Sequence, residues 1–309
     1  MEPITVITLA ISMTACLLTY IFKKVYTNRS TGGMTGVYMF SAIGCIVSAV
    51  VLFLWGGFGD TSVYTILLGA LFGIVVSLQG IFTTIAMMIG PMTYTVVIVS
   101  CSTVFTALSG FFFFGEKIGV LQLVGIVLMV GSFLFATEKK EGEKKGSLKW
   151  LVFCLLSFVM CGSIGFMQKL HQTSPHASEL NSFLIISFAV SFLFSLLFAL
   201  VYMKKEKLPL IEKSEKGSVD WLIFAIAVIS GVCVAANHKL NLGLSGVIPT
   251  AVFFPVVNGG NLVLTTLSAL IIFREKLTKK QWIGVVLGTA SVLFLCMPTE
   301  AIFSFALKG

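Results

Sequence analysis

The chain has 309 residues, of which 57% are hydrophobic and only 11% charged, and its formal net charge is +8. Soluble domains contain about 45–50% apolar and about 25% charged residues, so this composition excludes an ordinary soluble protein. The basic residues lie in short segments between apolar runs, not on one folded face. That distribution is typical of loops beside an anionic membrane surface and argues against a nucleic-acid partner.

Ten apolar runs are long enough to cross a bilayer, since about 20 apolar residues in a helix span its hydrocarbon core. These runs do not alternate between polar and apolar residues, as the strands of a membrane barrel would. The sequence therefore predicts an all-α, multi-pass transmembrane bundle of ten helices. The predicted runs are 4–22, 34–55, 63–89, 92–113, 119–136, 149–168, 180–203, 219–240, 248–273 and 281–297.

A charged linker at 139–148 divides the chain into two similar parts, 1–138 and 149–309. The motif that begins at Phe114 returns at Phe273, and the Gln122-x-x-Gly125 pattern returns as Gln281-x-x-Gly284, both at an offset of 159 positions. Five helices per part is an odd number, so the second part must enter the membrane in the opposite sense. Inverted repeats of this kind are typical of transporters that alternate access around a midplane site.

These motifs resemble those of the ten-helix EamA-type transporters of the drug/metabolite transporter superfamily. The resemblance implies that fold and alternating-access transport of small molecules, with the fifth and tenth helices packing peripherally. The first part departs from the pattern at Val96, where the second part has Pro255. The segments that carry the resemblance are Gly115-Glu116-Lys117, Gln122-Leu123-Val124-Gly125, Phe254-Pro255-Val256, Arg274-Glu275-Lys276-Leu277 and Gln281-Trp282-Ile283-Gly284.

Positive charge predicts the orientation of the chain. Of the 21 basic residues, 17 lie in the loops on one side of the predicted bundle and 4 on the other. Because Lys and Arg concentrate in cytoplasmic loops, we expect the basic loops in the cytoplasm and both termini outside, in the plasma membrane. The resemblance implies the reverse, with both ends in the cytoplasm, and we prefer the charge count.

Polar residues within the runs are the candidates for a site, because ionisable groups in a membrane are costly and usually functional. No Asp or Glu lies inside a run, and residues 4–22 lack the carboxylate on which small multidrug antiporters of the superfamily depend. The candidate substrate-binding residues are Gln79, Tyr94, Ser102, Asn237, His238, Asn258 and Asn261, and the basic candidates at helix ends are Lys24, Lys169 and Lys239.

Repeat symmetry adds two expectations about these candidates. Gln79 matches His238 at the 159 offset, so both should face one central cavity, and Asn258 and Asn261 share a helix face at i,i+3. The alternative is structural. Buried amides often serve as bonds between helices, worth about 0.6 kcal/mol on average, and lysines near helix ends often extend to the lipid headgroups.

The sequence thus predicts a gradient-driven or facilitative transporter of a small polar metabolite, such as an amino acid or sugar, with His238 as a candidate proton carrier. Multidrug efflux is an alternative, given 28 Phe and 12 Met, and a non-transporting scaffold or sensor is another. We expect no enzyme activity, cofactor or metal: no GxxxxGK[ST] loop occurs, and the seven cysteines form no CxxC pair. The expected partners are the substrate and membrane lipid, with the chain a monomer or a weak homodimer through the peripheral fifth and tenth helices. Gly69-x-x-x-Gly73 and Gly284-x-x-x-Gly288 are small-residue faces where helices can approach closely.

Overall fold

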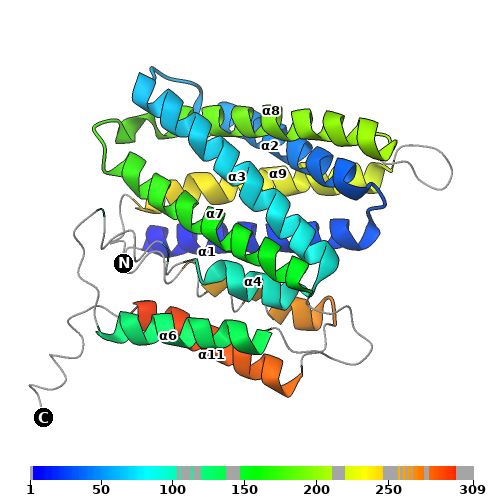
Figure 1. Ribbon diagram of the computed structural model, residues 1–309. Helices are drawn as coiled ribbons and strands as arrows, with labels where there is room; N and C mark the ends of the chain where they lie inside the picture. The colour runs from blue at the N-terminus through cyan, green and yellow to red at the C-terminus, as the bar shows by residue number, and fades with distance from the viewer. Residues whose placement is uncertain are drawn as a thin grey trace, which may run out of the picture. The chain divides into compact units, whose positions relative to one another are not determined.

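A computed structural model describes residues 3–102, 105, 113, 120–136, 147–210, 220–245, 257, 260–261, 264–265, 267–274 and 278–296 (Figure 1). All regular structure in these residues is helical, and they contain no strand. The helices are α1 (Pro3–Arg29), α2 (Gly33–Gly56), α3 (Val63–Ile89), α4 (Met92–Ser100), α6 (Val120–Ala136), α7 (Leu148–Gln172), the short 3₁₀ turn η1 (Ala177–Glu179), α8 (Leu180–Glu206), α9 (Trp221–Ser245) and α11 (Lys279–Cys296).

Six of these helices are long and apolar enough to cross a membrane. They also expose large apolar side chains, for example Leu54 at 79%, Leu67 at 67% and Leu193 at 63%. Exposed apolar surface on every long helix is unfavourable in water and favourable in lipid, so these helices indicate a multi-pass membrane protein. The six spans are Ile4–Arg29, Gly33–Gly56, Val63–Ile89, Leu148–Gln172, Ala177–Glu206 and Trp221–Leu244.

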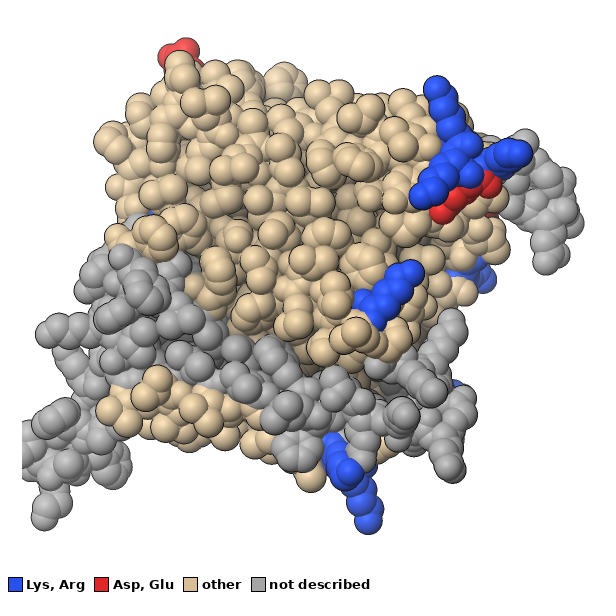
Figure 2. All heavy atoms as spheres, in the orientation of Figure 1, with Lys and Arg blue, Asp and Glu red and all other residues tan. Residues whose placement is uncertain are grey.

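Charged side chains gather at helix ends. In Figure 2 the surface over α3 and α8 shows no Lys, Arg, Asp or Glu between the ends of these helices, and basic side chains gather where α8 ends at Lys204 and Lys205. This is the distribution that hydrocarbon requires, because a charge at the bilayer centre is costly.

The observed helices follow most of the predicted runs but differ at two places. Helix α1 continues through the basic residues after position 22 to Arg29. The predicted run 92–113 is interrupted, because α4 ends at Ser100 and the next two residues form a turn in which the Ser102 N–H donates to the Val99 carbonyl at 3.0 Å. The fourth and ninth runs are described only in part, so the ten-helix inverted repeat stays a prediction.

The chain forms two compact units. Unit 1 comprises Met1–Met88 and Met167–Leu244, and unit 2 comprises Ile89–Phe166 and Ser245–Gly309. Each unit therefore contains residues from both parts of the predicted repeat, and α7 contributes its last turns to unit 1 and the rest to unit 2. The predicted repeat divides the chain at 139–148, whereas the compact units divide it at other positions.

Within unit 1, α8 packs against α2 and α3, and Figure 1 shows α2 and α8 side by side. Glycines allow the close approach to α3: a Cβ on Gly69 would lie 3.2 Å from the Phe183 carbonyl oxygen, and one on Gly73 would overlap that of Ser187. Small residues at a helix crossing let backbones approach, as predicted for this pair of glycines.

Hydroxyl groups then join the three helices through a serine seam, which we define as Ser41, Ser77, Ser191 and Ser195. Ser195 Oγ lies 2.6 Å from Ser77 Oγ and 3.0 Å from Ser41 Oγ, and Ser191 donates to the Gly73 carbonyl. Such bonds matter because lipid offers no alternative partner for a buried hydroxyl.

Two glutamates flanking α8 bind the N-termini of neighbouring helices. Glu206, at its end, accepts hydrogen bonds from the backbone N–H groups of Met34 (3.1 Å) and Thr35 (2.9 Å) at the start of α2. Glu179, just before α8, accepts from the backbone N–H and the hydroxyl of Ser62, before α3. A carboxylate suits these positions, because the first N–H groups of a helix lack partners within it and carry partial positive charge.

These contacts define the two ends of unit 1. We call the end with Arg29, Lys204 and Lys205 the basic end, and the end with Ser62 and Glu179 the distal end. Helix α9 starts at the basic end and crosses α2 at a small-residue contact, where Ser48 Oγ donates to the Gly231 carbonyl at 2.8 Å.

Unit 2 is described around α4, α6, α11 and most of α7. The Trp150 indole, fully buried, donates to Thr95 Oγ1 of α4 at 3.1 Å and fills the space beside Gly90, where a Cβ would lie 2.4 Å from the ring. Helices α6 and α11 lie side by side (Figure 1), joined by a hydrogen bond from Ser291 Oγ to the Gly125 carbonyl at 2.7 Å.

Candidate functional site

Polar side chains of the last turns of α9 meet α1 in unit 1. Asn237 Nδ2 donates to the Ser12 carbonyl at 3.0 Å and lies 3.3 Å from Ser12 Oγ, which donates to Asn241 Oδ1 at 2.7 Å. The amide groups are therefore bonded to a fully buried serine. For Asn237 this contact supports the structural alternative, a bond between helices.

His238, the next residue of α9, lies in an aromatic surround. The ring of Phe188 on α8 lies 5.4 Å from the imidazole centroid and that of Phe72 on α3 lies 6.1 Å away, both edge to face. The imidazole Nδ1 is buried and has no hydrogen-bond partner. A buried polar atom without a partner is unfavourable by about 1–3 kcal/mol. Such atoms are uncommon in native structures, so His238 Nδ1 is a candidate for a binding role.

Gln79 lies on the same face of α3 as Phe72, because seven residues make almost two turns. It therefore stands about 10 Å further along α3, toward the basic end. Its Nε2 donates to Thr83 Oγ1 at 3.1 Å. The structure thus places Gln79 and His238 in one unit. Phe72, on the same face of α3 as Gln79, packs against the His238 ring. The interactions described include no direct contact between Gln79 and His238.

The adjacent lysines of α1 point to different parts of unit 1. Lys24 Nζ donates to the Met87 carbonyl at 3.4 Å, near the C-terminus of α3. The amine of Lys23, which is partly buried, lies against Gly80: a Cβ placed on that glycine would be 3.8 Å from Lys23 Nζ. The predicted candidate Lys24 therefore lies at a helix end, where a cation complements the carbonyl groups, and its neighbour Lys23 is directed at the middle of α3.

Lys239 joins three helices at the distal end. Its Nζ donates to Asn181 Oδ1 at 3.0 Å and lies 4.7 Å from the centroid of the Trp55 ring. The Asn181 amide in turn donates to the carbonyls of Leu52 (3.3 Å) and Gly57. This cation therefore complements the C-terminal end of α2 through an amide and an aromatic face, which is a structural role.

The C-terminal end of α7 carries Lys169 and His171. His171 is fully buried, stacks on Phe183 at 4.3 Å between centroids, and has its Nε2 3.4 Å from Thr65 Oγ1. His176 Nδ1 pairs with Glu179 at 2.9 Å. Among the residues that the structure describes, no group of three His, Cys, Asp or Glu side chains could hold a metal ion. Lys169 is partly buried in the same turn of α7.

Three of the described candidates lie in unit 2. Tyr94 is fully buried with its ring edge-on to Trp150 at 6.4 Å, and Ser102 is buried in the turn after α4. Asn261 is 6% exposed, and its Oδ1 has no hydrogen-bond partner. Asn258 lies outside the described residues, so its predicted shared face with Asn261 stays a prediction. Asn261 is the strongest candidate of unit 2 by the same criterion as His238.

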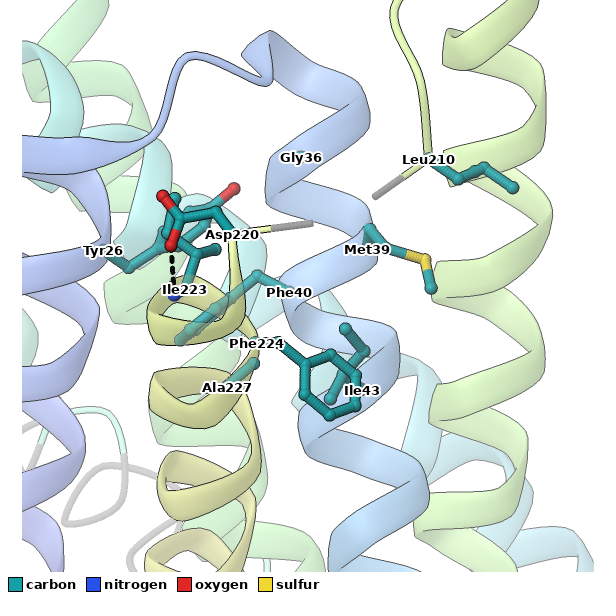
Figure 3. Close-up of a pocket in the computed structure, with 10 residues that line it drawn as sticks. All are labelled: Tyr26, Gly36, Met39, Phe40, Ile43, Leu210, Asp220, Ile223, Phe224 and Ala227. Atoms are coloured by element: carbon teal, nitrogen blue, oxygen red, sulfur yellow. Dashed lines mark hydrogen bonds between the residues drawn. The ribbon is translucent and has the colours of Figure 1, made fainter. Parts of the chain in front are cut away.

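One pocket of unit 1 lies near the basic end and another near the distal end. At the basic end, Tyr26, Phe40 and Phe224 enclose about 30 Å³, and Figure 3 shows Asp220 at this pocket, where its carboxylate accepts a hydrogen bond from the Ile223 N–H at 3.3 Å. That volume holds a water molecule or two but no metabolite. The distal pocket is shallow, holds about 300 Å³, and is lined by Tyr64, Leu170, Thr173, Ser174, Pro175 and His176.

Sequence reasoning missed three groups whose contacts the structure shows. Lys23 was counted only as a basic loop residue, and Glu206 was not singled out. The aromatic partners of His238 were counted only in the total of Phe residues. A helix-end Glu three residues before a Pro gives no signal of the distant N-terminus that it binds. A Lys-Lys pair likewise gives no signal of which lysine points inward.

Comparison with known proteins adds the fold but no activity. No protein-family model matches the chain. An uncharacterized protein of Haemophilus influenzae is 22% identical over 189 residues, which cover 61% of this chain and 60% of that protein, so the match spans less than two thirds of that relative's length. A solved crystal structure with 13% sequence identity matches with a TM-score of 0.59 over 98% of this chain and 99% of the other. The chain therefore shares its overall fold with a protein of known structure.

Proposed function

We propose that this protein is a secondary transporter of a small polar metabolite, driven by a gradient or acting as a facilitator, and that it belongs to the EamA-type transporters. The observation that carries the proposal is the His238 imidazole: a polar atom, Nδ1, buried among apolar membrane helices with no partner. Ionisable residues inside membrane spans are costly and commonly mark substrate or ion pathways.

Two further observations support this function over a scaffold. The polar side chains of α1, α3 and α9 in unit 1 come from spans that are otherwise apolar. The Lys23 amine of α1 lies beside Gly80 of α3, the residue next to Gln79. A scaffold would gain nothing from a partly buried lysine and an unpartnered imidazole, because each is unfavourable in lipid. The substrate would supply the partner that the imidazole Nδ1 lacks.

The test is a thermal-shift screen of the detergent-purified protein against amino acids and sugars, followed by uptake of the hits into proteoliposomes. We expect at least one compound to raise the melting temperature of the wild type and to accumulate in the vesicles. The Gln79→Ala/His238→Ala double variant should lose both effects. Thr14→Ala is the matched control, since the Thr14 hydroxyl is exposed and bonds only within α1, and it should behave as the wild type.

If no compound enters the proteoliposomes faster than it enters vesicles without the protein, the proposal is overturned. Export of lipophilic compounds is the second candidate function, and the aromatic surround of His238 by Phe72 and Phe188 favours it. A lipophilic cation such as ethidium therefore belongs in the same assay. Transport of ethidium without transport of any metabolite would replace the first function by the second.

A further inference from the structure

An apolar stripe on the surface of α8 leads to the lysines at the end of the helix. The stripe consists of Leu193, Leu197 and Val201, which follow at intervals of four residues and are 63%, 59% and 52% exposed. The next residue at this interval is Lys205, which is also exposed. Residues four apart are neighbours on a helix surface. From Leu193 to Lys205 the helix rises by about 18 Å, close to half the hydrocarbon thickness of a bilayer, about 15 Å. One phospholipid therefore fits along α8, with an acyl chain on the stripe and its headgroup at Lys205.

Aromatic rings of α2 and α8 hold Lys205 at this end of the stripe. Its Nζ lies 5.4 Å from the centroid of the Tyr202 ring. That ring stacks on Tyr38 of α2 at 5.3 Å between centroids, and Tyr38 also stacks on Phe198 of α8 at 5.4 Å. Tyrosine is enriched where a membrane meets water, because it combines an apolar ring with a polar hydroxyl. The two tyrosines therefore indicate that this end of α8 lies at the level of the lipid headgroups.

The positive charge of the basic end is not neutralised by the described part of the chain. Lys204, Lys205 and Lys207 are exposed at the end of α8, and Arg29 is exposed at the end of α1 (Figure 2). None of the four forms an ion pair with a described residue. Glu206 lies between two of the lysines in sequence, but its carboxylate oxygens are bonded to the N-terminus of α2. The surface at the end of α8 therefore complements a negatively charged headgroup.

We propose that the end of α8 binds an anionic phospholipid, with the phosphate at Lys204 and Lys205 and an acyl chain along Leu197 and Val201. This inference concerns a lipid site and does not depend on the proposed transport function. An anionic headgroup is favoured because each Lys or Arg near the membrane surface attracts anionic lipid. In a zwitterionic headgroup the ammonium group cancels the charge of the phosphate, so such a lipid gains less here. The stripe and the tyrosines determine where the lipid lies, and the lysines determine which headgroup it carries.

The experiment titrates two lipids with the same acyl chains, dioleoylphosphatidylglycerol and dioleoylphosphatidylcholine, into the detergent-purified protein. Binding is measured as the lipid concentration that gives half of the maximal thermal shift, and native mass spectrometry counts the bound lipid molecules. Glycerol 3-phosphate, a phosphate without acyl chains, is the third probe. The variants are Lys204→Gln/Lys205→Gln and Tyr202→Leu. The matched control is Lys149→Gln/Lys279→Gln, which removes the same charge from two exposed lysines in the first turns of α7 and α11.

We expect phosphatidylglycerol, and not phosphatidylcholine, to raise the melting temperature of the wild type and of the control variant, with the same half-saturating concentration. A lysine near an anionic headgroup contributes about fivefold in affinity, so Lys204→Gln/Lys205→Gln should raise that concentration about tenfold or more. Tyr202→Leu keeps both lysines but removes the ring beside Lys205, and an increase of about two- to fivefold is expected. Because both lysines are exposed, their variant should melt as the wild type does when no lipid is added.

Three results would overturn the inference. If the two lipids stabilise the wild type equally, or neither does, the headgroup charge plays no part. If the control variant loses as much affinity as Lys204→Gln/Lys205→Gln, net charge alone attracts the lipid and there is no site on α8. If glycerol 3-phosphate stabilises the protein as well as phosphatidylglycerol, the lysines take a free phosphate and the apolar stripe has no role. These measurements involve no transport, so their failure leaves the proposed function standing, and a failure of transport leaves the lipid site standing.

Discussion

Helices α8 and α9 both cross unit 1 and both carry polar side chains, but they use them differently. Along α8, whose residues are all described, each buried polar side-chain atom has a hydrogen-bond partner, from Ser182 on Gly59 to Ser195 on the serine seam. Along α9 the amide, imidazole and amine side chains all lie in the second half of the helix, and one of their atoms, His238 Nδ1, is buried without a partner.

The difference shows how structural and functional polar residues can be told apart in a membrane protein. A serine that bonds a neighbouring backbone gives a helix a fixed position and is fully satisfied by the protein itself. An imidazole nitrogen that the protein leaves unsatisfied is unfavourable unless another molecule supplies the partner. Hydrogen-bond satisfaction, rather than polarity, therefore separates α8 as a structural helix from α9 as a candidate binding helix.

The largest loss of stability is expected where α8 packs closely against α3. In Gly73→Ala the new Cβ would overlap the Ser187 carbonyl, so the helices must separate, and overpacking of this kind destabilises a protein by about 1–3 kcal/mol. Gly243→Ala on α9 is the control, because nothing lies within 4 Å of its added Cβ. Melting temperatures in detergent measure both, and equal values would contradict a close contact at Gly73.

An intermediate effect is expected at the end of α8. Glu206→Ala removes the acceptor for the first N–H groups of α2, and loss of such a cap destabilises by about 1 kcal/mol. Lys204→Ala, two residues earlier and exposed, is the control and should change stability little. The same melting experiment decides, and a Glu206→Ala variant as stable as the control would show that α2 does not depend on this carboxylate.

The smallest effect sharpens the comparison directly. Ser191→Ala removes a satisfied hydroxyl and should destabilise by about 0.6 kcal/mol, the average for a hydrogen bond between membrane helices. His238→Leu removes an unsatisfied atom from an aromatic surround and should leave stability unchanged or raise it, while abolishing uptake. If His238→Leu were the less stable of the two variants, the imidazole would be a structural group and the comparison would fail.

Hydropathy predicted the long helices well, because a span of about 20 apolar residues has few alternatives in lipid. Helices α2, α3 and α8 begin within a residue of their predicted runs. It did not predict the turn at Cys101 and Ser102, since a Ser-Cys-Ser sequence is apolar enough on average to continue a span. The break is local: the Ser102 N–H donates to the Val99 carbonyl three residues back, the tighter pattern that often ends an α-helix.

The candidate site was predicted only in part, for a similar reason. His238 followed from its rarity within an apolar run. The choice between Lys23 and Lys24 did not follow, because a helix that is apolar on all sides gives no periodic signal of which face meets its neighbours. The binding of Glu206 to Thr35, 171 residues away, likewise depends on tertiary contacts that no local pattern contains.

The two glutamates that flank α8 also limit how unit 1 can fit a bilayer. The part of α8 before Lys204 runs over 24 residues, 180–203, or about 36 Å of helix, whereas the hydrocarbon core of a typical bilayer measures about 30 Å. Both carboxylates are bonded to other helices, so neither end of α8 can shift by itself to match the lipid. Hydrophobic mismatch must then be met by tilting unit 1 as a whole or by deforming the surrounding lipid, which makes membrane thickness a property to which this protein should respond.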